Sequence, residues 1–91
     1  MRSTTERGGR IMTTDNFISK VNALNGVYAS KQREEHRMLI YIYKTCTHMC
    51  FAEILVKERV LNFFCRPQST EVAEDVLREL FRLICDYQEE K

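Results

Sequence analysis

Cysteine and histidine are the residues whose chemistry could make this chain a metal protein. Cys46 and Cys50 lie four residues apart, His48 lies between them, and Cys65 and Cys85 are distant in the sequence. On a helix, His48 would point away from both neighbouring cysteines, so the three do not form a zinc site. All four cysteines fall within apolar stripes, where a free cysteine behaves as a small hydrophobe. We therefore predict buried, reduced thiols and no metal ligands.

Catalysis has little support in the same residues. A nucleophilic cysteine needs a base that a third group orients, and neither His36 nor His48 has such a group nearby. Gly-rich turns that build an oxyanion hole or cradle a phosphate are absent, and so are cofactor motifs. The sequence predicts a protein that is not an enzyme, with no cofactor and no small-molecule substrate.

A modest basic patch at residues 31–37 raises the alternative of nucleic-acid binding. It consists of Lys31, Arg33 and Arg37, and the arginines of the N-terminal leader would extend it. Two glutamates interrupt the patch, and the whole chain has a net charge of only +1. Specific nucleic-acid binders generally carry a stronger basic stripe. A small nucleic-acid-binding regulator therefore stays the alternative function.

Length and composition indicate one globular domain. A chain of 91 residues with 44% hydrophobic residues has room for a single core and is too apolar to be disordered throughout. We predict a disordered leader over residues 1–12, which is rich in Ser, Thr, Arg and Gly, and a single helical domain over 13–91. The longest nearly apolar stretch is too short to span a membrane. Reduced thiols favour an intracellular protein, cytoplasmic or nuclear.

Glycine and proline divide the domain into three segments, because Gly26 and Pro67 are the only such residues after the leader. A helical stripe and a capping residue predict a first helix over residues 14–25. Well-separated apolar and charged faces predict a last helix over residues 69–88, capped by Ser69 or Thr70.

The middle segment, Val27–Arg66, has 40 residues without Gly or Pro. A helix over residues 30–65 would be about 54 Å long, although a globule of this size is only roughly 30 Å across. Residues 41–48 have the lowest helix propensity and read alternatively as a short strand, but one strand has no partner. The predicted fold is therefore all-α: a bundle of three or four helices whose central helix is long or broken.

The central segment also indicates a function. Its apolar side chains spread over more than half of a helical wheel, so either both neighbouring helices of the bundle cover this surface or part of it binds a partner. Glu53 and Lys57 project into this arc as an (i, i+4) ion pair, either at the rim where the stripe meets solvent or inside a helix–helix interface, where the pair would select a partner. We predict a small non-catalytic protein–protein interaction module, a subunit or adaptor that self-associates or packs on a larger partner through its apolar central helix. The predicted partner-binding residues are Tyr43, Cys50, Glu53, Ile54, Lys57, Leu61 and Phe64.

Overall fold

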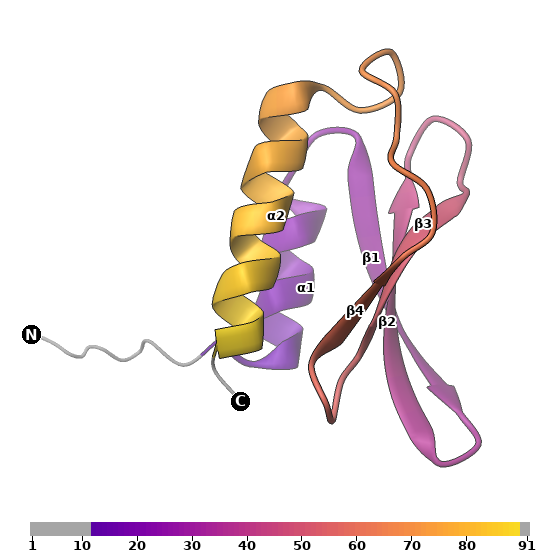
Figure 1. Ribbon diagram of the computed structural model, residues 1–91, viewed down its shortest axis with the longest axis vertical. Coiled ribbons are helices and arrows are strands. Elements are labelled where there is room, and N and C mark those ends of the chain that lie inside the picture. Colours follow the sequence, from indigo (N-terminus) through magenta and orange to yellow (C-terminus); the bar gives the residue numbers. More distant parts are fainter. Residues whose placement is uncertain (1–11, 90–91) are drawn as a thin grey trace, which may run out of the picture.

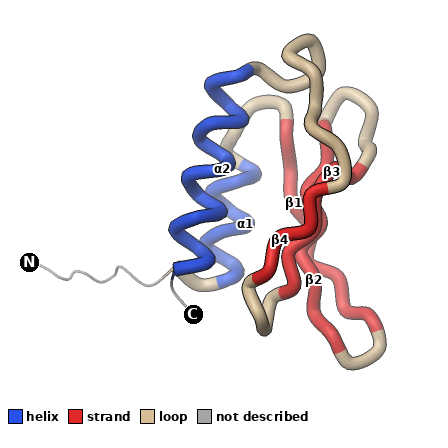
Figure 2. Tube along the Cα trace, viewed as in Figure 1, coloured by secondary structure: helices blue, strands red, loops and turns tan. Residues whose placement is uncertain are grey.

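The computed structural model describes residues 12–89, and these form a small α+β fold (Figure 1). The elements follow one another as α1 (Thr14–Asn22), β1 (Val27–Glu34), β2 (Arg37–Lys44), β3 (Cys50–Leu55), β4 (Val60–Phe63) and α2 (Glu74–Glu89). The four strands make one antiparallel sheet in the order β1-β2-β3-β4, so each strand pairs with its neighbour in the chain (Figure 2).

The all-α prediction is therefore wrong, because the middle segment is a β-sheet and there is no helical bundle. The error lies in the turns. All three turns between strands contain a residue with positive φ that is not glycine: Glu35 at 51°, His48 at 59° and Arg59 at 59°. Left-handed backbone normally favours Gly or Asn. With neither residue present, the sequence showed no break where the chain reverses direction.

The sequence of strand β2 also lacks the alternation of apolar and polar residues that would have indicated a strand. Ile40 and Ile42 are fully buried on the side of the sheet that faces the helices. Leu39, Tyr41 and Tyr43 alternate with them and therefore point to the opposite side. Because both sides of β2 are apolar or aromatic, the strict alternation typical of a half-buried strand is absent. Their β-branched and aromatic side chains nevertheless suit a strand.

The two predicted helices are present, with different ends. Helix α1 is capped by Thr13, whose hydroxyl accepts a hydrogen bond of 3.1 Å from the backbone N–H of Asn16. Helix α2 begins at Glu74 rather than near Ser69. The intervening residues form a turn that Glu71 organises.

Glu71 joins this turn to the sheet. Its carboxylate accepts a hydrogen bond of 3.1 Å from the backbone N–H of Gln68 and forms an ion pair of 3.0 Å with buried Lys44. These two interactions hold the pKa of Glu71 below its usual value. The approach to α2 is therefore tied to the end of β2.

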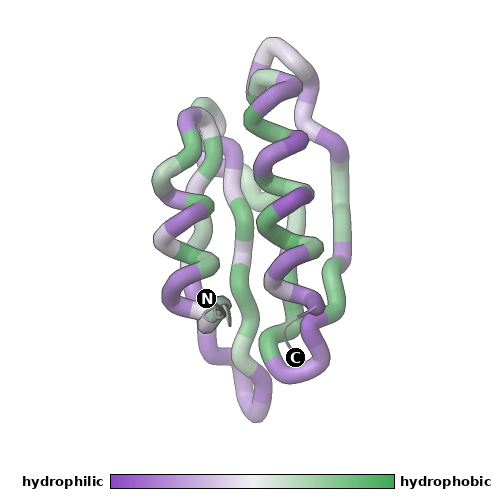
Figure 3. The backbone as a smooth tube through the Cα atoms, turned by 90° about the vertical axis from the view of Figure 1, so that its left-hand side faces the viewer, coloured by the Kyte–Doolittle hydropathy of each residue, from purple (hydrophilic) through white to green (hydrophobic). Residues whose placement is uncertain are grey.

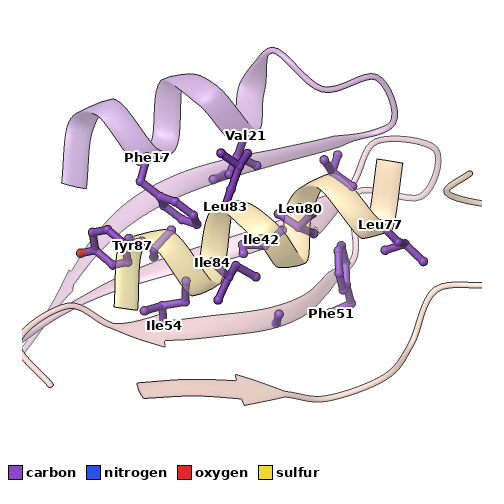
Figure 4. Packing of buried hydrophobic residues seen from close by; sticks show 14 of the residues in the cluster. Phe17, Val21, Ile42, Phe51, Ile54, Leu77, Leu80, Leu83, Ile84 and Tyr87 are labelled. Carbon is purple, nitrogen blue, oxygen red and sulfur yellow. The ribbon is translucent and has the colours of Figure 1, made fainter. Parts of the chain in front are cut away.

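Both helices lie side by side on one face of the sheet (Figures 1 and 3). Between the layers is a single core, which Figure 4 shows from close by. Its largest fully buried side chains come from both helices, from the inner face of the sheet and from the turn before α2: Phe17, Val21, Ile40, Ile42, Phe51, Ile54, Val72, Leu77, Leu80, Ile84 and Tyr87.

Tyr87 connects three parts of the fold. Its ring stacks on Phe17 of α1 with centroids 4.7 Å apart. The guanidinium of Arg59, a residue of the β3–β4 turn, lies 4.0 Å from the centroid of the Tyr87 ring. Its hydroxyl and that of Thr14 are hydrogen-bonded at 2.7 Å. The Arg59 guanidinium also donates to the Tyr87 carbonyl at 2.6 Å, near the negative end of the α2 dipole.

Most of the predicted disordered leader, residues 1–12, lies outside the described residues. Met12 is described, and it is partly buried against the core. Within the described chain, neither helix is long and apolar enough to cross a membrane.

Ile54 provides a test of this fold, because it was predicted to bind a partner but is fully buried in the core. We expect Ile54→Ala to lower the free energy of unfolding by about 2–5 kcal/mol, through lost burial and the cavity left behind. Lys57→Ala, at an exposed turn position, should change it by less than about 0.5 kcal/mol. Urea denaturation followed by circular dichroism measures both. Equal stability of the two variants would contradict the placement of Ile54.

Candidate functional site on the open face of the sheet

One face of the sheet is covered by no element of residues 12–89, because α1 and α2 both lie on the other (Figure 1). Strand pairing identifies the side chains of this open face. Tyr28 of β1 is paired with Tyr43 of β2, and Tyr41 is paired with Glu53 of β3. Asn62 of β4 continues the row beside Glu53. Aromatic and acidic side chains from three strands are thus brought together, with an amide from the fourth.

Three tyrosines, Tyr28, Tyr41 and Tyr43, form what we call the tyrosine cluster. The rings of Tyr28 and Tyr43 are stacked, with centroids 4.9 Å apart, and Tyr41 lies edge-on to Tyr43 at 6.4 Å. At one end of the cluster, the Tyr28 hydroxyl is hydrogen-bonded to Nδ1 of His48 at 3.1 Å. All three tyrosines are only partly buried. The cluster is therefore both preorganised and accessible.

Two carboxylates flank Tyr41. Its hydroxyl donates a hydrogen bond of 2.5 Å to Glu34, and Glu53 lies directly across on β3. The hydrogen bond to Glu34 is the main reason that the pKa of Tyr41 rises to about 12, and the negative charges of Glu34 and Glu53 add to it. The two carboxylates attract a positive charge to this part of the face, where Arg37, paired with Glu34, is the neighbouring cation.

The predicted partner-binding residues are only partly brought together. Tyr43, Cys50 and Glu53 lie on the open face, where Tyr43 is paired with Cys50. Partial burial is the main cause of the raised pKa of Tyr43. The Cys50 thiol donates to the Ala52 carbonyl at 3.1 Å.

The other four predicted residues lie elsewhere. Ile54 is in the core, and Leu61 is partly buried against the core on the helix-bearing side. Lys57 is exposed in the β3–β4 turn, and Phe64 is exposed just after β4. A surface that contains all seven residues therefore does not exist.

The helical ion pair predicted between Glu53 and Lys57 is wrong, because these residues lie on a strand and in a turn. Glu53 instead accepts a hydrogen bond of 2.9 Å from the side-chain amide of Asn62.

The prediction of buried cysteines is also wrong. Cys46, Cys65 and Cys85 are exposed, and Cys50 is partly buried; all four are free thiols. Their burial was expected from helical stripes: strands, turns and a loop replace the stripe that contained Cys46, Cys50 and Cys65, whereas Cys85 does lie on a helix, α2, but is exposed there. Among residues 12–89, no three Cys, His, Asp or Glu side chains gather as metal ligands.

The basic patch of residues 31–37 is divided between two sides of the sheet. Lys31 and Arg33 alternate with the open-face residues of β1, and Lys31 forms an ion pair of 3.0 Å with Asp15 of α1. Arg37 is paired with Glu34 and lies on the open face. The three cations therefore do not form one continuous surface.

Helical reasoning missed Tyr28, Tyr41, Glu34 and His48. One signal was present, since Tyr41 and Tyr43 are two residues apart and share a face if the segment is a strand. The partners from β1 and the following turn depend on the register of the hairpin, which the sequence did not show.

Comparison of the chain with protein-family models, curated proteins and solved structures produced no match. The chemistry of the open face itself must therefore indicate what it binds.

The environment of Tyr41 has a measurable consequence. Glu34→Gln keeps the size of the side chain but removes the charge that holds the phenol protonated. We expect the pKa of Tyr41 to fall from about 12 toward the ordinary value of roughly 10. Titration of the tyrosine ring carbons by NMR measures this shift. Glu58→Gln, in the exposed β3–β4 turn, is the matched control and should leave the pKa of Tyr41 unchanged.

Proposed function

We propose that this protein is a small non-catalytic protein–protein interaction module whose open sheet face binds a basic segment of another protein. The observation that carries the proposal is the position of Tyr41, which lies between two carboxylates and beside two stacked tyrosines on an uncovered face. An adaptor or complex subunit needs an accessible, preorganised surface of this kind.

Arginine and lysine fit the chemistry of this face. A guanidinium or ammonium is attracted to the face of an aromatic ring, and such a contact contributes about 0.5–1 kcal/mol at an exposed site. Glu53 lies on the strand next to the tyrosines and accepts charge-assisted hydrogen bonds from the same cation. Arginine uses both kinds of contact, because its planar group stacks on rings and donates in several directions.

The same charges disfavour the nucleic-acid alternative. Exposed aromatic rings on a sheet also stack on bases, but single-strand binders combine them with a positively charged groove. Here Glu34 and Glu53 lie on the aromatic face with a single cation of the basic patch, Arg37, while Lys31 is turned away and paired with Asp15. The phosphate backbone would meet negative charge at the tyrosines.

A titration with defined probes tests the proposal. The probes are an unstructured Gly/Ser peptide with three arginines, the same peptide with three glutamates, and a single-stranded oligothymidine. Three of the chain's four tyrosines are in the tyrosine cluster and tryptophan is absent, so tyrosine fluorescence reports on this face. We expect the arginine peptide to quench this emission and to shift the backbone NMR signals of Tyr41 and Glu53.

Matched variants locate the binding. Glu53→Gln and Tyr43→Leu should each weaken arginine-peptide binding roughly two- to fivefold, which corresponds to about 0.5–1 kcal/mol. Glu58→Gln makes the same charge change in the exposed turn and should have no such effect. Tighter binding of oligothymidine than of the arginine peptide at low salt would contradict the proposal and favour nucleic acid.

A further inference from the structure

The two edge strands of the sheet, β1 and β4, differ in how well they are protected against pairing with a further strand. Backbone N–H and C=O groups of alternate residues on an edge strand point outward and lack a partner within the sheet. On β1 these outward groups belong to Val27, at the start of the strand, and then to Ala29, Lys31 and Arg33, since the residues between them form their backbone hydrogen bonds with β2. The outward N–H of Ala29 donates to the Asn22 side chain at 2.7 Å. The next two outward positions carry positive side chains, which disfavour strand addition.

Strand β4 has neither protection. Asn62 and Phe64 point their backbone groups toward β3, as the hydrogen bond of 2.9 Å from Phe64 N–H to the Phe51 carbonyl shows. The outward groups are therefore those of Leu61 and Phe63. The segment from Val60 to Cys65 contains no charge, glycine or proline. Three of its side chains are large, apolar and exposed: Val60 by 45%, Phe63 by 41% and Phe64 by 57%.

An uncharged and apolar strand edge of this kind favours pairing with another strand. We propose that β4 pairs antiparallel with β4 of a second copy of this chain, on a two-fold axis at Asn62. In this register, Leu61 lies opposite Phe63 of the second copy, and each such pair exchanges both of its backbone hydrogen bonds. All the outward groups of Leu61 and Phe63 are then satisfied.

Side chains are compatible with the same register. Val60 lies opposite Phe64 of the second copy, so two exposed apolar residues cover each other. Leu61 joins Phe63 on the helix-bearing side, where Phe63 already packs edge-on against Phe51 at 6.1 Å and Phe81 at 5.5 Å. Just beyond the paired segment, Arg66 is held in its own chain by an ion pair of 3.0 Å with Glu74. A short edge of this size predicts a weak dimer.

This pairing is independent of the proposed function, because it uses the β4 edge and leaves the tyrosine cluster free. Self-pairing through β1 is disfavoured, since it would place Lys31 and Arg33 of two copies against each other.

Sedimentation equilibrium over micromolar to submillimolar concentrations tests the dimer, and charge variants test its register. We expect the wild-type mass to rise from one chain to two. V60K/F64K places lysines opposite each other and should raise the dimer dissociation constant at least about tenfold. V60E/F64K carries the same number of substitutions but pairs glutamate with lysine, so it should dimerise much more tightly than V60K/F64K. Mixing V60K/F64K with V60E/F64E should restore a dimer.

Hydrogen exchange gives a readout that does not depend on any variant. The N–H groups of Leu61 and Phe63 should become protected as the wild-type concentration rises, while those of Lys31 and Arg33 should not. A wild-type chain that stays monomeric throughout would overturn the proposal. Protection of Leu61 and Phe63 only on addition of an unrelated extended Thr/Val peptide would also overturn it and would assign the edge to a foreign strand. Equal dissociation constants for V60K/F64K and V60E/F64K would overturn the register.

Dimerisation and the proposed function fail separately. Loss of arginine-peptide binding in Tyr43→Leu with an intact dimer concerns only the open face. A monomeric wild-type chain that still binds the peptide overturns only the pairing of β4.

Discussion

Packing around the Tyr87 ring is the interaction on which the arrangement of the whole molecule depends. The ring lies against Phe17 on one helix and the Arg59 guanidinium on the last hairpin, and its hydroxyl meets Thr14. The Tyr87 ring thereby holds both helices and the β3–β4 end of the sheet together. Because the helices are held together on one face, no element of residues 12–89 covers the other face, and the tyrosine cluster is accessible there.

Arg59 shows how one residue can serve both backbone and packing. Its positive φ turns the chain from β3 to β4, and its side chain reaches the end of α2. The side-chain amide of Gln88 in turn donates to the Arg59 carbonyl at 3.0 Å. A glycine would make the same turn with less strain, but it would lose the contacts with Tyr87. The sheet and the last helix are joined through a turn residue that sequence patterns assign to a helix.

The helices of this fold could be predicted from the sequence, but the sheet could not. The two helices were predicted because their apolar residues recur with the helical period and their charged residues lie on the opposite face. The sheet was not recognised, because Glu35, His48 and Arg59 make its turns without glycine and because β2 is apolar on both faces. The open face was found only through Tyr43, Cys50 and Glu53. Its other members depend on strand register, which is a property of contacts between segments far apart in the chain.

The unequal edges of the sheet also set an upper limit on assembly. A sheet that adds strands at both edges grows without end, as fibrils do. Here the Asn22 side chain and the positive charges of Lys31 and Arg33 guard β1, so growth is disfavoured on that side. Pairing through β4 occupies the less protected of the two sheet edges in residues 12–89, so further growth is disfavoured. The chain can thus keep one edge strand available for pairing while its other edge disfavours polymerisation.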